Sequence, residues 1–425
     1  MANAAYLPRI IDDRVENYLN AFGAVCIEGP KWCGKTWTSA HHSKSAFYLA
    51  DPANNFRNRQ LVNYSLDYAL QGGTPRLIDE WQEYPQLWDA VRMEVDKRAD
   101  TGQFILTGSS TPVHKGILHS GAGRIAKISM HTMSLYEAGK STGEVSLKDV
   151  CEGREIKPGA VTDSSLEQLA EYIICGGWPA SVTLPFSKAK LIPEKYLQAV
   201  LDEDIYKLDE INHNVRKMEL LLRSLARNES TTVSIRKLCD DISENETATV
   251  DAKTLAGYLD VFKRLFITDN QQPFSTNIRS SVRIKQAEKR HFCDPSLAAC
   301  LLKSTVSGLI NDLKTFGFLF EALCERDLRI YAESMGANLY HYRDYADNEI
   351  DAVIELEDGN WCAFEIKLGA HQTDVAAKQL IKLKNKISEE GGKLPAVLGV
   401  ITGTSNFAHQ REDGVCVIPI TALKN

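Results

Sequence analysis

The chain has 425 residues, 44% of them hydrophobic and 25% charged, a balance typical of soluble globular proteins with two to four domains. Its formal net charge of -7 argues against a protein that coats nucleic acid, although it is compatible with a local basic groove. It has no run of about 18 apolar residues, no secretory start and no paired cysteine motif, so we expect a cytoplasmic protein without membrane contact.

Residues 1–140 alternate strand-like and helix-like segments. This alternation predicts an α/β domain with a parallel sheet and crossover helices. The expected strands are Ala24–Ile27, Phe47–Leu49, Arg76–Asp79, Phe104–Leu106 and Ile125–Ile128.

A phosphate-binding motif follows the first expected strand and precedes a helix-compatible segment. The pattern GxxxxGK[ST] is matched without deviation by Gly29, Pro30, Lys31, Trp32, Cys33, Gly34, Lys35 and Thr36. In such a loop the backbone N–H groups point at phosphate oxygens, and glycines let the backbone wrap closely. We expect Lys35 to neutralise the terminal phosphates and Thr36 to bind Mg²⁺. The sequence therefore predicts a site for ATP with Mg²⁺.

Two further strand ends carry polar residues suited to the same site. Asp79 and Glu80 end one apolar strand, as in a Walker B motif; Asp79 would hold the metal and Glu80 would orient or deprotonate the attacking water. Thr107 and Ser109 end another strand and are candidates to sense the γ-phosphate or the water. The alternative for Glu80 is a solvated surface residue.

Arg124 directly precedes the expected strand Ile125–Ile128. It is a candidate arginine finger, which would stabilise charge in the transition state. The alternative is an ordinary surface arginine.

The middle of the chain is mostly helical. Residues 141–211 resemble a linker followed by a helical lid, and residues 212–300 resemble a winged helix, with apolar stripes at helical spacing. Basic residues follow in strand-like sequence, and in a DNA reader they would form the wing: Arg279, Arg283, Lys285 and Lys289. The alternative is a helical module that packs between domains, because the third helix presents few outward Arg or Asn residues.

Residues 301–425 form a second α/β pattern with a cluster of charged residues. Two alternating strands flank a turn at Asp358–Gly359, and a hairpin there would place Asp351 within about one residue of the position opposite Glu365. Lys367 lies on the same strand face as Glu365, and Glu321 could join from a helix. The pattern D-x13-E-x-K is that of PD-(D/E)XK nucleases, in which Asp351 and Glu365 would hold the metal. The alternative is an exposed strand with alternating charges.

Taken together, these motifs resemble AAA-like ATPases of bacteria and archaea that carry a C-terminal domain of unknown function. The resemblance covers nearly the whole chain. It includes two further elements, Gly176-Gly177-Trp178-Pro179 and Asp294 in the run His291 to Asp294. In the family a glutamine often stands where this chain has Trp32. The resemblance implies a winged-helix module and a restriction-endonuclease-like C-terminal fold.

Two functions from different classes fit these motifs. The first is an ATPase whose cycle controls a DNA-acting nuclease domain. The second is a nucleotide-dependent switch whose nuclease-like domain binds DNA or protein without cutting. A small-molecule kinase is disfavoured, because Glu80 after Asp79 suits activation of water. A homo-oligomer is compatible with either function.

Overall fold

The computed structural model describes residues 6–111, 117–156, 164–208, 214–243, 250–277, 279–344 and 348–425. These residues form two compact units. Unit 1 comprises 1–132, 202–212 and 260–267, and unit 2 comprises 133–201, 213–259 and 268–425. The expected boundary at 211–212 lies outside the described residues. In the described part of the chain, no helix combines the length and the apolar character that crossing a bilayer requires.

Unit 1 is built on a five-stranded sheet in the order β2-β3-β4-β1-β5, and every neighbouring pair is parallel. The five expected strands are confirmed with small shifts at their ends. Their bounds are β1 Ala24–Glu28, β2 Ser45–Tyr48, β3 Arg76–Asp79, β4 Phe104–Gly108 and β5 Ile125–Ser129.

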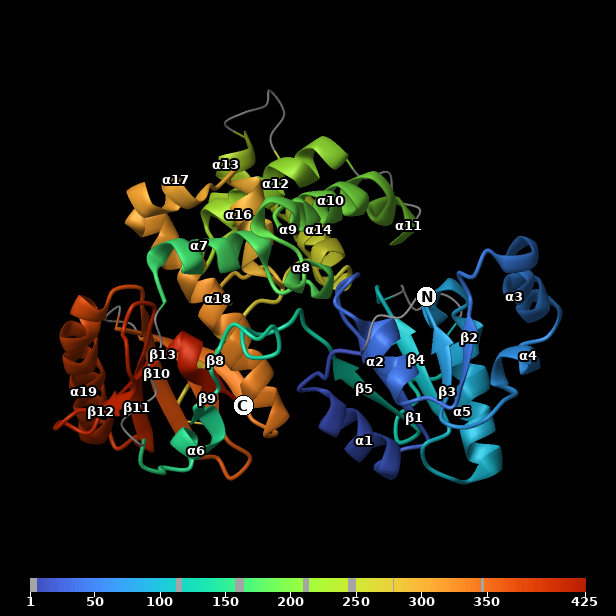
Figure 1. The fold of residues 1–425 in the computed structure, drawn as a ribbon, viewed down its shortest axis with the longest axis horizontal. Coiled ribbons are helices and arrows are strands. Elements are labelled where there is room, and N and C mark those ends of the chain that lie inside the picture. Colours follow the sequence, from blue (N-terminus) through green and yellow to red (C-terminus); the bar gives the residue numbers. More distant parts are fainter. Residues whose placement is uncertain are drawn as a thin grey trace. The chain divides into compact units, whose positions relative to one another are not determined.

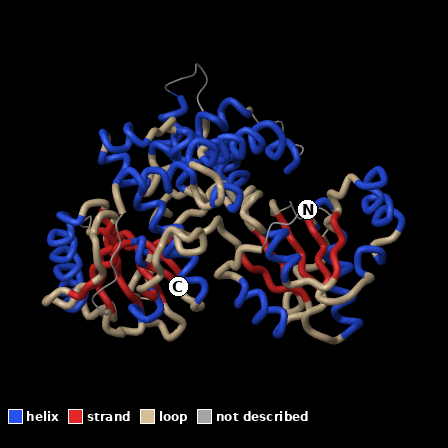
Figure 2. Tube along the Cα trace, viewed as in Figure 1, coloured by secondary structure: helices blue, strands red, loops and turns tan. Residues whose placement is uncertain are grey.

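Helices cover both faces of this sheet, because alternate residues of each central strand point to opposite sides. Ala24 and Cys26 of β1 pack into one hydrophobic cluster, and Val25 and Ile27 pack into the other. Figure 2 shows these strands lying between helices. The helices of this segment are α1 Asp12–Ala21, α2 Lys35–His41, α3 Ala53–Tyr64, α4 Asp67–Leu70 and α5 Gln86–Arg98.

Unit 2 contains a seven-stranded mixed sheet in the order β12-β13-β11-β10-β9-β8-β7. Helix α18 (Leu313–Ser334) packs on β8, β9 and β10, whereas α19 (Thr373–Glu389) packs on β10 and β11, and Figure 1 shows the two helices flanking the sheet. The strands are β7 Gln272–Pro273, β8 Asn338–Arg343, β9 Glu349–Glu355, β10 Trp361–Lys367, β11 Val397–Thr402, β12 His409–Gln410 and β13 Cys416–Pro419. An α/β C-terminal region is therefore confirmed.

A short pairing joins the end of the chain to the expected linker. Strand β14 (Leu423–Lys424) runs parallel to β6 (Val145–Ser146), which leads into α6 (Leu147–Cys151). Ser141 Oγ also donates to the Leu423 carbonyl at 2.6 Å. The described part of the linker is thus structured.

The middle region is helical, as expected. Its helices are α7 Leu166–Cys175, α8 Pro179–Val182, α9 Phe186–Ala189, α10 Leu191–Ala199, α11 Ile205–Leu208, α12 Val215–Arg227, α13 Ile235–Ser243, α14 Ala252–Arg264, α15 Val282–Lys285, α16 Pro295–Leu301 and α17 Val306–Asn311.

The wing expected after α14 takes a different form. Residues 268–273 form single bridges with 289–292 and then add β7 to the edge of the large sheet beside β8. Arg283 reaches Glu355 with both terminal nitrogens, at 3.1 and 2.8 Å, and Lys289 is buried. Two of the four basic residues expected in the wing are therefore engaged within the protein: Arg283 lies on α15, and Lys289 lies in the segment that bridges to residues 268–273.

Candidate nucleotide-binding site

The P-loop leaves the carboxyl end of β1 and leads directly into α2. A side chain at position 29 would be impossible, because a Cβ atom there would lie 2.1 Å from the Met130 carbonyl oxygen. Gly34 has φ 109°, in the region that favours glycine. Trp32 has φ 65° and is half exposed. The loop thus has the strand, turn and helix context that a phosphate site requires.

Lys35 is buried at the first position of α2. Its ammonium donates to the carbonyl oxygens of Gly29 and Pro30, both at 2.8 Å. These contacts hold the charge inside the curve of the loop. Lys31 is engaged elsewhere in unit 1, in an ion pair with Asp204, a partner that the sequence did not indicate.

Asp79 joins the P-loop to two neighbouring strands. Its Oδ1 atom accepts hydrogen bonds from Thr36 Oγ1 and from Thr107 Oγ1, each at 2.8 Å. The sheet order β3-β4-β1 explains the meeting, since parallel strands end at one edge. Burial raises the pKa of Asp79, and the bonds from Thr107 and Thr36 offset part of this rise.

Glu80 stands one residue beyond β3, with a left-handed backbone (φ 60°). Its N–H donates to Thr107 Oγ1 at 2.9 Å, and its Oε2 accepts from Ser109 Oγ at 2.6 Å. Gln82 also donates to the Glu80 carboxylate and to Ser109 Oγ, the latter at 3.1 Å. The sequence did not single out Gln82, because its approach depends on the tight turn at Glu80.

These side chains include the oxygen donors that Mg²⁺ requires. The hydroxyl of Thr36 and the carboxylate of Asp79 are hard ligands, and they already lie within hydrogen-bonding distance of each other. The residues therefore fit a magnesium ion that would arrive with a nucleotide.

Arg124 lies at the opposite edge of the sheet, so it does not reach the P-loop of its own chain. It directly precedes β5, and its carbonyl accepts from the N–H of Ala24 at the start of β1. The five residues of β1 separate that edge from the P-loop by roughly 16 Å. The guanidinium instead pairs with Asp96, 2.7 Å from Nε. The geometry therefore does not support a finger role for Arg124 at the P-loop of its own chain, since a residue before a parallel strand lies at the amino end of that strand.

The charged residues of the C-terminal region do come together. Strands β9 and β10 are antiparallel with Phe364 opposite Ala352, so Glu365 is next in line with Asp351, as the expected hairpin requires. Lys367 Nζ lies 3.1 Å from Asp351 Oδ2 and 2.6 Å from Glu365 Oε2. Lys289 Nζ lies 2.5 Å from Glu321 Oε1.

This second cluster does not fit a bound metal ion as it stands. Two ammonium groups, those of Lys289 and Lys367, occupy the space among its carboxylates. Within the described ranges of the chain, no three or more His, Cys, Asp or Glu side chains are arranged to hold a metal. The metal role expected for Asp351 and Glu365 is therefore not supported by the geometry.

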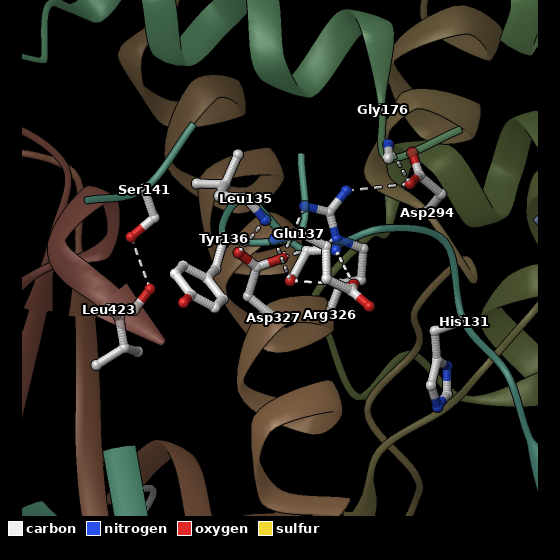
Figure 3. Close-up of polar contacts among 12 residues, drawn as sticks. His131, Leu135, Tyr136, Glu137, Ser141, Gly176, Asp294, Arg326, Asp327 and Leu423 are labelled. Atoms are coloured by element: carbon white, nitrogen blue, oxygen red, sulfur yellow. Dashed lines mark hydrogen bonds and ion pairs between the residues drawn. The ribbon is translucent and has the colours of Figure 1, made fainter. Parts of the chain in front are cut away.

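The two remaining family-like elements meet in a buried ion network (Figure 3). Arg326 of α18 donates to Asp327 Oδ1 at 2.7 Å and to Asp294 Oδ2 at 3.1 Å. Asp294 also accepts from the N–H of Gly177, and Asp327 accepts from that of Leu135, both at 2.9 Å. These elements therefore have a structural explanation, because they hold segments far apart in sequence around one guanidinium.

Three protein-family models match successive parts of the chain. Residues 21–139 match the family described as AAA domain, and residues 316–423 match a domain of unknown function, DUF4143. Residues 166–307 match another domain of unknown function, DUF8612. Uncharacterized proteins of Mycobacterium tuberculosis and Mycobacterium bovis are each 24% identical over 359 residues, which is 83% of this chain and 72% of theirs.

Solved structures resemble the chain only loosely. A Walker-type ATPase of Pyrococcus abyssi has 10% identity and a TM-score of 0.41, covering 68% of this chain and 94% of that one. The Orc1 protein of Aeropyrum pernix in complex with DNA has 10% identity and a TM-score of 0.23, covering 70% and 93%. The Hef helicase domain of Pyrococcus furiosus has 11% identity and a TM-score of 0.21, covering 93% and 89%.

The parallel sheet and the P-loop define the class of the N-terminal part, which has the fold of a P-loop NTPase and matches the AAA domain family over residues 21–139. In this chain a helical middle connects that part to a C-terminal part that matches DUF4143.

The buried ion network yields a stability prediction. Replacing Arg326 by methionine leaves Asp294 and Asp327 buried without this guanidinium. We therefore expect the free energy of unfolding of unit 2 to fall by roughly 3–5 kcal/mol. Urea denaturation followed by circular dichroism measures this change. Arg154, whose side chain is exposed and pairs at the surface, serves as the control. An equal loss in Arg154→Met would contradict the prediction.

Proposed function

We propose that the AAA domain binds ATP with Mg²⁺ and hydrolyses it to ADP and phosphate. The observation that carries this proposal is that Thr36 and Thr107 both donate hydrogen bonds to Asp79, at the edge of the sheet where the P-loop begins. Three motifs from separate parts of the sequence supply one residue each. Their convergence beside a glycine loop gives the parts that triphosphate hydrolysis uses.

The loop residues would bind and orient the phosphates. Backbone N–H groups between Gly29 and Lys35 and the first turn of α2 would face the phosphate oxygens. Lys35 would exchange its two carbonyl partners for the terminal phosphates, where its charge is better compensated. Thr36 and Asp79 would hold the magnesium ion, which neutralises charge on the phosphates. Thr107 would keep Asp79 oriented through its hydrogen bond.

Glu80 is the proposed base. Its carboxylate would accept a proton from the attacking water while the bond from that water to the γ-phosphorus forms and the bond to the leaving oxygen breaks. Ser109 and Gln82 already hold this carboxylate, so they would set its direction.

Two substitutions separate binding from hydrolysis. Lys35→Ala should remove most nucleotide affinity, whereas Glu80→Gln should retain it and release phosphate roughly 100-fold or more slowly, because the proton acceptor is lost. Fluorescent nucleotide binding and phosphate release measure the two effects, with the exposed Lys97→Ala as control. Phosphate release at the wild-type rate from Lys35→Ala would overturn the proposal.

A positioning role for Gln82 predicts a selective effect. Removing its amide in Gln82→Ala should lower kcat roughly tenfold and leave KM near the wild-type value, because one hydrogen bond to the base is lost. The exposed Gln60→Ala is the matched control. If Gln82→Ala raises KM and leaves kcat unchanged, Gln82 acts on substrate binding and the positioning role is refuted.

For the C-terminal domain, the geometry favours the second of the two candidate functions, a nucleotide-dependent switch that binds without cutting. The observation behind this choice is the pair of ammonium groups within the carboxylate cluster. DNA stays a predicted partner, and the exposed Arg279 and Lys285 are the members of the expected basic segment that could reach a phosphate backbone.

Incubation with DNA discriminates the two candidates. Supercoiled and linear DNA with Mg²⁺ or Mn²⁺, with and without ATP, should remain uncut by the wild-type chain. Metal-dependent cutting that disappears in Glu365→Gln would show that the domain is a nuclease and would refute the switch without cleavage.

A further inference from the structure

The C-terminal cluster has a cation supplied by the chain itself. Lys289 Nζ faces three carboxylates, at 2.5 Å from Glu321 Oε1, 3.1 Å from Glu349 Oε1 and 3.5 Å from Asp351 Oδ1. An ammonium group has three hydrogens, so these three acceptors are the number it can satisfy. The side chain is only 1% exposed. Lys289 is thus a buried charge with a complete set of counter-charges.

The backbone fixes this lysine in place. Lys289 and Gln271 exchange both backbone hydrogen bonds, each at 2.9 Å. The side-chain amide of Gln271 donates to the carbonyls of Tyr340 and Asp351, at 2.8 and 3.1 Å. Through Gln271, Lys289 is therefore attached to β8 and to β9, the strand that carries Glu349 and Asp351.

The charge state of the cluster agrees with this placement. Burial alone would lower the pKa of Lys289, but the neighbouring carboxylates of Glu321, Asp351 and Glu349 raise it above its ordinary value, so the group stays protonated. Lys289 and Lys367 together place two ammonium groups against the carboxylates that would otherwise face a divalent cation.

We infer that Lys289 is an internal cation that takes the place of a divalent metal in the C-terminal cluster. It lies in residues 166–307, which match one family, and it neutralises carboxylates of residues 316–423, which match another. The middle domain thereby keeps the acidic site of its neighbour closed to metal. Removing the ammonium should open that site, because the side chains of Glu321, Glu349 and Asp351 would then be free to turn toward a cation and offer it three hard oxygen ligands.

Titration with Mn²⁺ alone, without nucleotide, tests this inference by electron paramagnetic resonance. The wild-type chain should leave the free Mn²⁺ signal unchanged. Lys289→Met should bind about one equivalent, at least roughly tenfold more tightly than the wild type, and Lys289→Met/Asp351→Asn should lose it. Lys285→Met, an exposed lysine from the same segment, is the matched control and should behave as the wild type.

Two results would overturn the inference. One is a wild-type chain that binds Mn²⁺ at a site lost in Asp351→Asn, a result that does not depend on whether the Lys289 variant folds. The other is a folded Lys289→Met chain that binds none, with folding checked by circular dichroism and by the effect of Mn²⁺ on Tm. Neither readout involves ATP turnover, so a failure here is distinct from a failure of the proposed ATPase.

Discussion

The carboxylate of Asp79 is the point on which the organisation of unit 1 depends. It accepts from Thr36 at the start of α2 and from Thr107 at the end of β4. Residues from three adjacent parallel strands, or from the segments that follow them, therefore contact one buried carboxylate. The P-loop beside it can adopt its curved path because Gly29 has no side chain. Burying a carboxylate is costly unless it is hydrogen-bonded, so its partners are part of the fold as well as part of the proposed chemistry.

Unit 2 uses buried charge for a different purpose. Arg326 joins Asp294 and Asp327, and through them the backbones of Gly177 and Leu135. Lys289 performs a similar task in the acidic cluster. In both places a cation from one segment satisfies carboxylates of another, and removing one partner would leave an uncompensated charge. Charged residues that resemble a catalytic motif can thus have a structural role, because they hold together segments that are distant in sequence.

Much of the fold could be predicted from the sequence, because buried parallel strands appear as short apolar runs and the P-loop motif has strict spacing. The register of Asp351 with Glu365 also followed from the turn at Asp358–Gly359 and the period of a strand. Lys289 could not be identified in this way. Its partners are distant in sequence, and its basic, strand-like segment predicts a wing, whereas in the structure Lys289 pairs with Gln271. The position of Gln82 near the Glu80 carboxylate depends on the left-handed backbone at Glu80, which the sequence does not indicate.

Nucleotide binding at the P-loop is measured most directly by calorimetric titration of the chain with a non-hydrolysable ATP analogue in the presence of Mg²⁺. We expect saturable binding of one nucleotide per chain, and this binding should disappear or weaken strongly when the magnesium is chelated. A titration that shows no binding of adenine nucleotide, with the chain folded by circular dichroism, would contradict it.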